Sequence, residues 1–148
     1  MQPLQFLVPL DPIEAVGPYL PAVILVLVLA NMATRALAHR TYRKQAAASE
    51  DDEELSMYTP HNLTNLLLVF ASFAFLLVEP HGGMVMSVLV LGVFLTDVFE
   101  FESRKVEARN GLDFEQPKAA VAASLIALLY AGFQSLFQFV APFWNAVV

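Results

Sequence analysis

Four long apolar stretches, separated by shorter polar ones, dominate the order of residues along the chain. A helix needs roughly 20 mainly apolar residues to cross the hydrocarbon core of a bilayer. Stretches of about this length cover residues 18–37, 60–79, 84–101 and 117–143. The pattern therefore predicts an all-α fold, an integral membrane four-helix bundle formed by a single transmembrane domain over residues 1–148.

Local signals mark where these helices begin and end. Thr59 can cap free amides at the start of the second helix, and Pro60 fits its first turn. Residues 79–83, Glu-Pro-His-Gly-Gly, are predicted to form a turn, and the third helix is predicted to begin near Met84. A turn this short makes the second and third helices antiparallel neighbours. Asn110 and Gly111 fit the C-terminal stop of a third helix that continues past its span.

The ends of the spans differ in charge, and this difference predicts the orientation. All eight basic residues fall in two stretches, Arg35 to Lys44 and Arg104 to Lys118. Because Lys and Arg are retained on the cytoplasmic side, the loops at about residues 38–59 and 102–116 are predicted to be cytoplasmic. Both termini then lie on the extracytoplasmic side. The apolar segment at the start, broken by prolines, is too short to span and is expected at the membrane interface.

Composition supports a multi-pass protein of the cell membrane. The hydrophobic fraction is 57% and the mean hydropathy is +0.60, above the values usual for soluble domains. The chain has no cysteine, which excludes disulfides, thiolate metal ligands and cysteine nucleophiles. Its net charge of −6 suits a saline cytoplasm, where carboxylates help to keep the surface hydrated.

Asp97 is the sharpest candidate for chemistry, because it lies inside the third predicted span. Counting about 1.5 Å per residue places it roughly 20 Å into that span, one or two turns short of the cytoplasmic surface. The same count puts Asn31, Arg35, Asn65 and Ser124 of the other spans at a similar depth. The sequence therefore predicts an intramembrane polar cluster of these residues.

This cluster has two interpretations. In a proton or cation site, Asp97 would titrate or coordinate, Asn31 and Asn65 would supply amide oxygens, and Arg35 would tune the charge. In a structural cluster, the same groups would hold the helices together, or Asp97 would reach the hydrated interface beside Glu100. We favour the structural interpretation, because a carboxylate this near the surface can be partly hydrated.

Three histidines raise the question of a haem or metal. His39 and His61, near the cytoplasmic surface on adjacent helices, are geometrically suited to one haem, but histidines at such interfaces are more often solvated. His81 with Glu79 offers too few ligands for zinc. We therefore predict no cofactor and no metal site.

The known catalytic motifs are also missing from the sequence. It contains no phosphate loop, nucleophile elbow or zinc-protease motif. Every basic cluster is offset by acids, so nucleic-acid binding is not expected. The sequence predicts no enzyme and no catalytic residue.

Three segments of the chain resemble a family of small integral membrane proteins of halophilic archaea whose function is uncharacterised. These segments are Tyr58-Thr-Pro-His-Asn-Leu-Thr-Asn-Leu-Leu-Leu, the stretch from Asp97 to Asn110, and the ending Ala141-Pro-Phe-Trp-Asn-Ala-Val-Val. The resemblance covers most of the chain and implies a four-helix membrane architecture. It implies no activity, ligand or catalytic residue.

These observations favour a non-catalytic role over an enzymatic one. We expect an accessory or scaffold subunit of a larger membrane complex, whose partners are membrane lipids and other membrane-protein subunits or further copies of itself. The alternative is a small ion- or proton-coupled transporter that uses Asp97 and the neighbouring polar residues. A haem-bearing electron carrier is the third interpretation.

Overall fold

The computed structural model describes residues 10–48 and 55–147, and this part of the chain is helical apart from its connections. The elements follow in this order: α1 (Leu10–Val16), the 3-10 turn η2 (Gly17–Tyr19), α2 (Leu20–Ala48), α3 (Thr59–Val78), α4 (Pro80–Arg109) and α5 (Lys118–Val147). The all-α prediction is confirmed.

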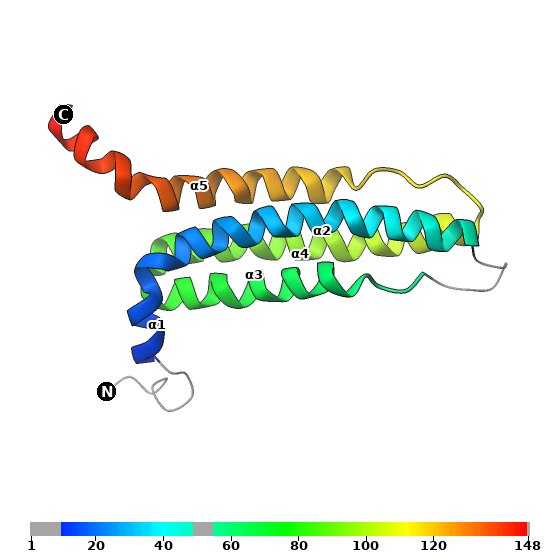
Figure 1. Cartoon of the computed structure of the whole chain (residues 1–148), viewed down its shortest axis with the longest axis horizontal. Coiled ribbons are helices and arrows are strands. Elements are labelled where there is room, and N and C mark those ends of the chain that lie inside the picture. Colours follow the sequence, from blue (N-terminus) through cyan, green and yellow to red (C-terminus); the bar gives the residue numbers. More distant parts are fainter. Residues whose placement is uncertain (1–9, 49–54, 148) are drawn as a thin grey trace.

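The helices α2, α3, α4 and α5 lie side by side as an up-and-down bundle (Figure 1). Contacts join α2 to α3, α3 to α4, α4 to α5 and α5 back to α2, so each helix has two neighbours in a closed ring. Within the described residues, four helical segments are long and apolar enough to cross a membrane: Asp11–Ala48, Thr59–Val78, Pro80–Arg109 and Lys118–Phe137. This agrees with the four stretches read from the sequence.

The hairpin between α3 and α4 is tighter than the sequence indicated. Helix α3 ends at Val78 and α4 begins at Pro80, so the residues expected to complete a turn belong to the first turn of α4. The prediction that the third helix begins near Met84 was therefore wrong. A proline fits the opening turn of a helix, because the N–H groups of that turn have no acceptor within the helix and the N–H that proline lacks is therefore not missed.

Close backbone contact makes this short hairpin feasible. A Cβ on Gly83 would lie 2.2 Å from the Cα of Leu76, a distance that real side chains do not reach. Only glycine lets α4 begin so near to α3. The backbone N–H of Gly83 donates to the carbonyl of Glu79 at 2.7 Å, which closes the turn.

Two further helix ends test the sequence signals. Tyr58 occupies the N-cap position of α3 and no side chain caps that end, so the prediction that Thr59 acts as a cap was wrong. Helix α4 ends at Arg109, followed by Asn110 at its C-cap and by Gly111 with φ of +65°. This stop was predicted correctly, because Gly111 adopts the left-handed conformation that glycine favours.

The ends of the chain leave the bundle. Helix α1 runs across the end of the bundle, and the last turns of α5 diverge from it (Figure 1). Pro142 lies inside α5, and a proline ring clashes with the carbonyl four residues earlier and bends a helix. Most of the apolar start expected at the interface, like the acidic run at residues 50–54, lies outside the described residues.

A dry core fills the half of the bundle near the α3–α4 hairpin. Its most buried members are apolar side chains of all four long helices: Ile24, Val28, Leu68, Phe75, Met86, Val90, Val93, Ala127 and Ala131. The small side chains on α5 allow that helix to approach its neighbours closely. A Cβ on Gly92 would have no atom within 4 Å, so this glycine does not pack against a neighbouring helix.

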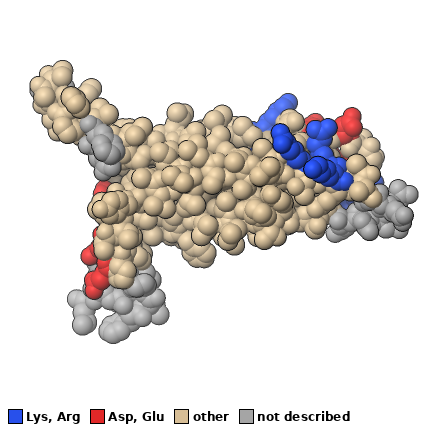
Figure 2. Space-filling model, in the orientation of Figure 1, with Lys and Arg blue, Asp and Glu red and all other residues tan. Residues whose placement is uncertain are grey.

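On the face of the molecule drawn in Figure 2, charged side chains lie at the two ends of the bundle, and the basic ones lie at one of these ends. Figure 2 shows lysine and arginine side chains gathered at the end opposite α1 and the last turns of α5. Outward-facing apolar side chains cover the length between the ends, among them Val26 (64% exposed), Phe70 (68%) and Leu129 (74%). Such an apolar band is typical of a surface that faces lipid.

Candidate functional site

The centre of the site is an ion pair between α2 and α4. Arg35 donates from Nε to Oδ1 of Asp97 and from Nη2 to Oδ2, both at 2.9 Å. The two side chains are 5% and 8% exposed. This parallel geometry matches the planar guanidinium to both carboxylate oxygens, the strongest arrangement available to such a pair.

Amide and hydroxyl groups from the other helices complete the contacts of Arg35. Its Nη1 donates to Oγ of Ser124 on α5 at 2.5 Å, and its Nη2 donates to Oδ1 of Asn31 at 2.7 Å. Asn31 in turn donates to Oδ1 of Asn65 on α3 at 2.8 Å. The structure thus brings together all the residues that the sequence placed at one depth, and hydrogen bonds connect them across four helices.

Helical spacing explains why these groups meet. Asn31 and Arg35 are one turn apart on α2, so both face the interior of the bundle. Asp97 follows the start of α4 by 17 residues, which corresponds to about 25 Å along the axis. This depth matches that of Arg35, which lies one turn before the positions where α2 becomes strongly basic. Asp97 therefore does not extend to the interface beside Glu100, as one interpretation of the sequence held.

Three members of the network were not found from the sequence. The imidazole of His61 lies between two helices, with Nε2 at 3.1 Å from Oδ2 of Asp97 and Nδ1 at 2.8 Å from Oγ1 of Thr34. Thr64 accepts from Nδ2 of Asn31 at 2.9 Å. A signal was present, because His61 precedes Asn65 by four residues and so shares its face of α3, and Thr64 follows His61 by three residues.

The network is closed to bulk water but bordered by two small cavities. One has a volume of about 40 Å³, and Asp97, His61 and Glu100 contribute to its lining. The other, of about 80 Å³, is lined by Asp97, His61 and Asn65 together with apolar and tyrosine side chains. Cavities of this size can hold a few water molecules each. Both lie toward the basic end of the bundle, on the side where Tyr42 and Phe101 pack with ring centroids 5.3 Å apart.

A second, smaller set of ion pairs fixes the connection between α4 and α5. Arg104, 4% exposed, lies 3.3 Å from Glu100 and 2.8 Å from Glu107, and it also donates to the backbone carbonyl of Glu115. Glu100 and Arg104 are four residues apart on α4, which is the spacing of one helical turn. These bonds attach the loop to the last turns of α4.

The structure does not favour a haem or metal between the histidines. Both ring nitrogens of His61 are already engaged by Thr34 and Asp97. Across residues 10–48 and 55–147 no group of three or more His, Cys, Asp or Glu side chains is arranged to hold a metal ion. His81 is exposed at the far end of the bundle.

The arrangement can act in two ways. A carboxylate held by a bidentate arginine in a water-poor interior connects helices and resists separation, because parting the pair would leave buried charges without partners. The same carboxylate beside an imidazole and two small cavities has the parts of a proton site. The geometry alone allows both chemistries.

Comparison with known proteins places the chain in a family without assigning a chemistry. The family DUF7313, described as a domain of unknown function, matches residues 2–148. No curated protein and no solved structure matches the chain.

Proposed function

Because the chain belongs to the DUF7313 family, whose description names no activity, we propose its function from its own geometry. The protein is a non-catalytic integral membrane subunit that acts as an accessory or scaffold component of a larger membrane assembly. The observation that carries this proposal is the commitment of both carboxylate oxygens of Asp97 to Arg35. A carboxylate bound in this way is suited to joining helices rather than to loading and releasing an ion.

The topology is part of the proposal. By their sequence positions, all eight basic residues lie in the last part of α2, the last part of α4 or at the start of α5, which meet at one end of the bundle. By the positive-inside rule that end faces the cytoplasm. The start of α1 and the end of α5 lie at the opposite end (Figure 1), so both termini face outward.

The outer surface supports assembly with other membrane helices. Large aromatic and branched side chains point away from the bundle along its whole length, for example Phe99 at 68% and Phe133 at 56% exposure. Gly92 and Gly132 leave open space beside α4 and α5, where another helix can approach closely. Lipids, other membrane subunits or a second copy of the chain are the partners that such a surface accepts.

Gentle detergent extraction followed by mass spectrometry tests the subunit proposal. The tagged full-length protein should recover a partner in fixed stoichiometry, either another membrane protein or further copies of itself. An untagged strain provides the background. Recovery of a homogeneous single chain with bound lipid and detergent alone would contradict the proposal.

A second candidate is a small proton- or ion-coupled transporter, favoured by the two cavities that reach Asp97 and His61 from the basic end. It predicts that Asp97→Asn abolishes proton uptake by proteoliposomes loaded with a pH-sensitive dye. Glu102→Gln is the matched control, because the side chain of Glu102 is 58% exposed and lies outside the network. Equal uptake by the wild type and a monodisperse Asp97→Asn protein would remove this candidate.

A saline cytoplasm is the proposed setting. The chain has 14 acidic and 8 basic residues, and its segments resemble proteins of halophilic archaea. Acidic surfaces of this kind keep their hydration in concentrated salt. The purified protein should therefore keep its helical content better in concentrated potassium chloride than in dilute buffer, and circular dichroism measures this.

A further inference from the structure

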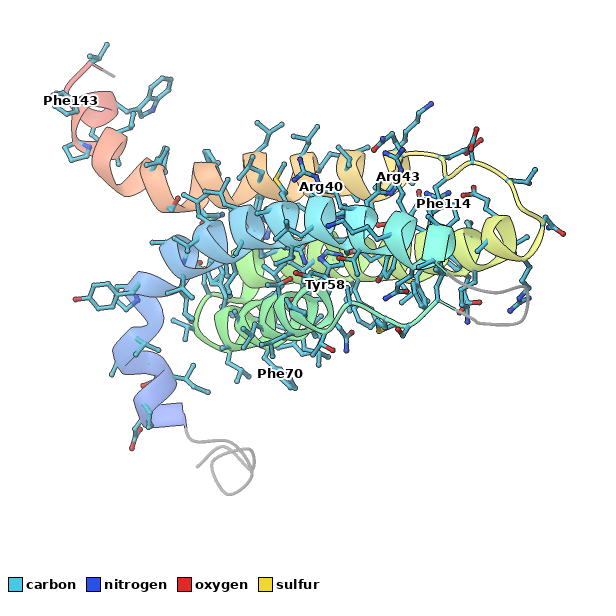
Figure 3. All side chains as sticks on the ribbon, turned by 45° about the vertical axis from the view of Figure 1, so that its right-hand side comes forward. Arg40, Arg43, Tyr58, Phe70, Phe114 and Phe143 are labelled. Atoms are coloured by element: carbon cyan, nitrogen blue, oxygen red, sulfur yellow. The ribbon has the colours of Figure 1, made fainter. Side chains whose placement is uncertain are left out.

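A groove runs between α2 and the start of α5 at the basic end of the bundle. Its volume is about 290 Å³, which exceeds either cavity beside Asp97. Arg40, Arg43 and His39 line it from α2, and Gln116, Pro117 and Val121 line it from the other side. Figure 3 shows Arg40 and Arg43 on the side of α2 that faces α5.

The charge of this groove is of one sign. Three arginines and a histidine contribute to the lining, and no acidic residue does. Arg35 is committed to Asp97, whereas Arg40 and Arg43 are exposed and form no ion pair with a residue that the structure describes. Elsewhere at this end arginine has acidic neighbours, as Arg104 does. Among the described residues, the lining of the groove therefore carries positive charge and no acidic side chain.

His39, which lines both this groove and the smaller cavity beside Asp97, also has a buried polar atom without a partner. His39 is 9% exposed, and its Nε2 has no hydrogen-bond partner among the described residues. Buried polar groups are nearly always paired, so an unpaired one calls for a ligand, ion or water. A negatively charged oxygen would complete the hydrogen bonding of this imidazole and of both arginines.

The start of α5 adds to the attraction. The first N–H groups of a helix have no intrahelical acceptor, and the helix dipole favours an anion there. Pro117, directly before α5, lines the groove, and the first intrahelical bond runs from the N–H of Val121 to the carbonyl of Pro117 at 2.9 Å. The groove thus lies beside the positive end of a helix of 30 residues.

The lining changes from polar to apolar along the bundle. Met32, Ala36 and Val121 form its inner end; on α2, Ala36 and Met32 precede Arg40 by about one and two turns and so lie deeper in the apolar region. A free phosphate would fill only the basic end. A lipid would place its charged headgroup at the arginines and its glycerol and acyl chain along the apolar side chains.

We propose that this groove binds the phosphate group of an anionic membrane lipid, held by Arg40, Arg43 and His39. The groove adjoins the network around Asp97, because Arg35 lines both, but Arg40 and Arg43 make no contact with that network and the proposal does not depend on the scaffold proposal. It gives the two α2 arginines a specific ligand in addition to their effect on topology.

Native mass spectrometry of the full-length protein in detergent tests the site. The protein is titrated with phosphatidylglycerol and with phosphatidylcholine, which share a phosphate but differ in net charge. We expect the wild type to bind phosphatidylglycerol about tenfold more tightly, because each nearby basic residue strengthens binding to an anionic headgroup. The variant Arg40→Gln/Arg43→Gln should reduce this preference to within about twofold.

The control variant Lys44→Gln/Lys105→Gln removes the same number of charges outside the groove and should keep the preference of the wild type. Equal preference in the groove variant and the wild type would overturn the proposal. An equal loss in the control would also overturn it, because net charge would then explain the binding. Full displacement of phosphatidylglycerol by millimolar inorganic phosphate would identify a free phosphate, and not a lipid, as the occupant.

Discussion

At the scale of single residues, the buried charges are the feature that most constrains this molecule. Arg35 and Asp97 neutralise each other in the interior, and Asn31, Ser124 and His61 satisfy their remaining hydrogen-bonding groups. A charge in such a place is tolerated only when its partner is present. The pair therefore makes the register of α2 against α4 specific, because sliding either helix by one turn would separate the charges.

Replacing Asp97 by asparagine tests this role. The amide has nearly the same shape but leaves the guanidinium of Arg35 buried without a counter-charge, so the free energy of unfolding should fall by about 3 kcal/mol. Reversible unfolding by SDS in mixed micelles measures the change. Glu102→Gln, at a largely exposed site on the same helix, should change stability by less than about 0.5 kcal/mol.

The double variant Arg35→Leu/Asp97→Leu extends this test. With both charges removed, no buried ion is left unpaired, so its loss of stability should be smaller than the sum of the losses in the two single variants. Strictly additive losses would show that the two side chains act independently and would contradict the proposed coupling.

Much of this site could be predicted from the sequence, and the remainder could not for a physical reason. Depth follows from counting residues along an apolar helix, which is how Asn31, Asn65 and Ser124 were grouped with Asp97. The bidentate geometry depends on how the helices rotate and pack, which no single helix determines. His61 was treated as a solvated histidine because it lies near the start of α3, although its spacing from Asn65 placed it on the inner face.

At the scale of elements, close backbone packing decides how the helices are joined. The hairpin of α3 and α4 has a single residue between its helices, and Gly83 allows the contact with Leu76. The sequence indicated a hairpin but placed the start of the second helix too late, because Pro80 was assigned to the turn and is in fact the first residue of α4. Proline serves both purposes, and only the packing distinguishes them.

Gly83→Ala should therefore weaken the hairpin. The new methyl group would clash with the backbone of Leu76, and relief requires the helices to separate, at a cost of about 2–3 kcal/mol. Gly92→Ala on the same helix is the control, because a Cβ at this position would have no atom within 4 Å. Alanine there should be neutral or should stabilise the protein by up to about 1 kcal/mol. Melting temperatures of the two proteins in detergent give the comparison, and equal melting temperatures would contradict the close contact.

The connection from α4 to α5 depends on one arginine. Arg104 contacts Glu100, Glu107 and the carbonyl of Glu115, and so holds the loop against α4. Arg104→Gln should release the loop and increase its cleavage by protease in detergent about fivefold or more, since local opening governs cleavage. Lys105→Gln should leave cleavage unchanged, because Lys105 pairs only with the exposed Glu102 among the carboxylates described. Equal cleavage of both variants would contradict the role of Arg104.

At the scale of the whole molecule, the surface is charged at the two ends of the bundle and apolar between them. The length of the bundle is covered by exposed apolar side chains, and the basic residues cluster at the end that carries the two long connections. In the proposed orientation across a bilayer, the Arg35–Asp97 pair lies within the inner half, and the groove proposed to bind lipid lies at the inner headgroups. The polar network and the groove therefore both depend on the direction in which the chain crosses the membrane.

Single-cysteine labelling in intact cells tests this direction most directly, because the natural chain contains no cysteine. With a membrane-impermeant maleimide, Asp11→Cys and Val147→Cys should react in intact cells, whereas Ser56→Cys and Asp113→Cys should react only after permeabilisation. All four positions are exposed in the structure. Labelling of Ser56→Cys or Asp113→Cys from outside intact cells would contradict the four-span topology with its basic end in the cytoplasm.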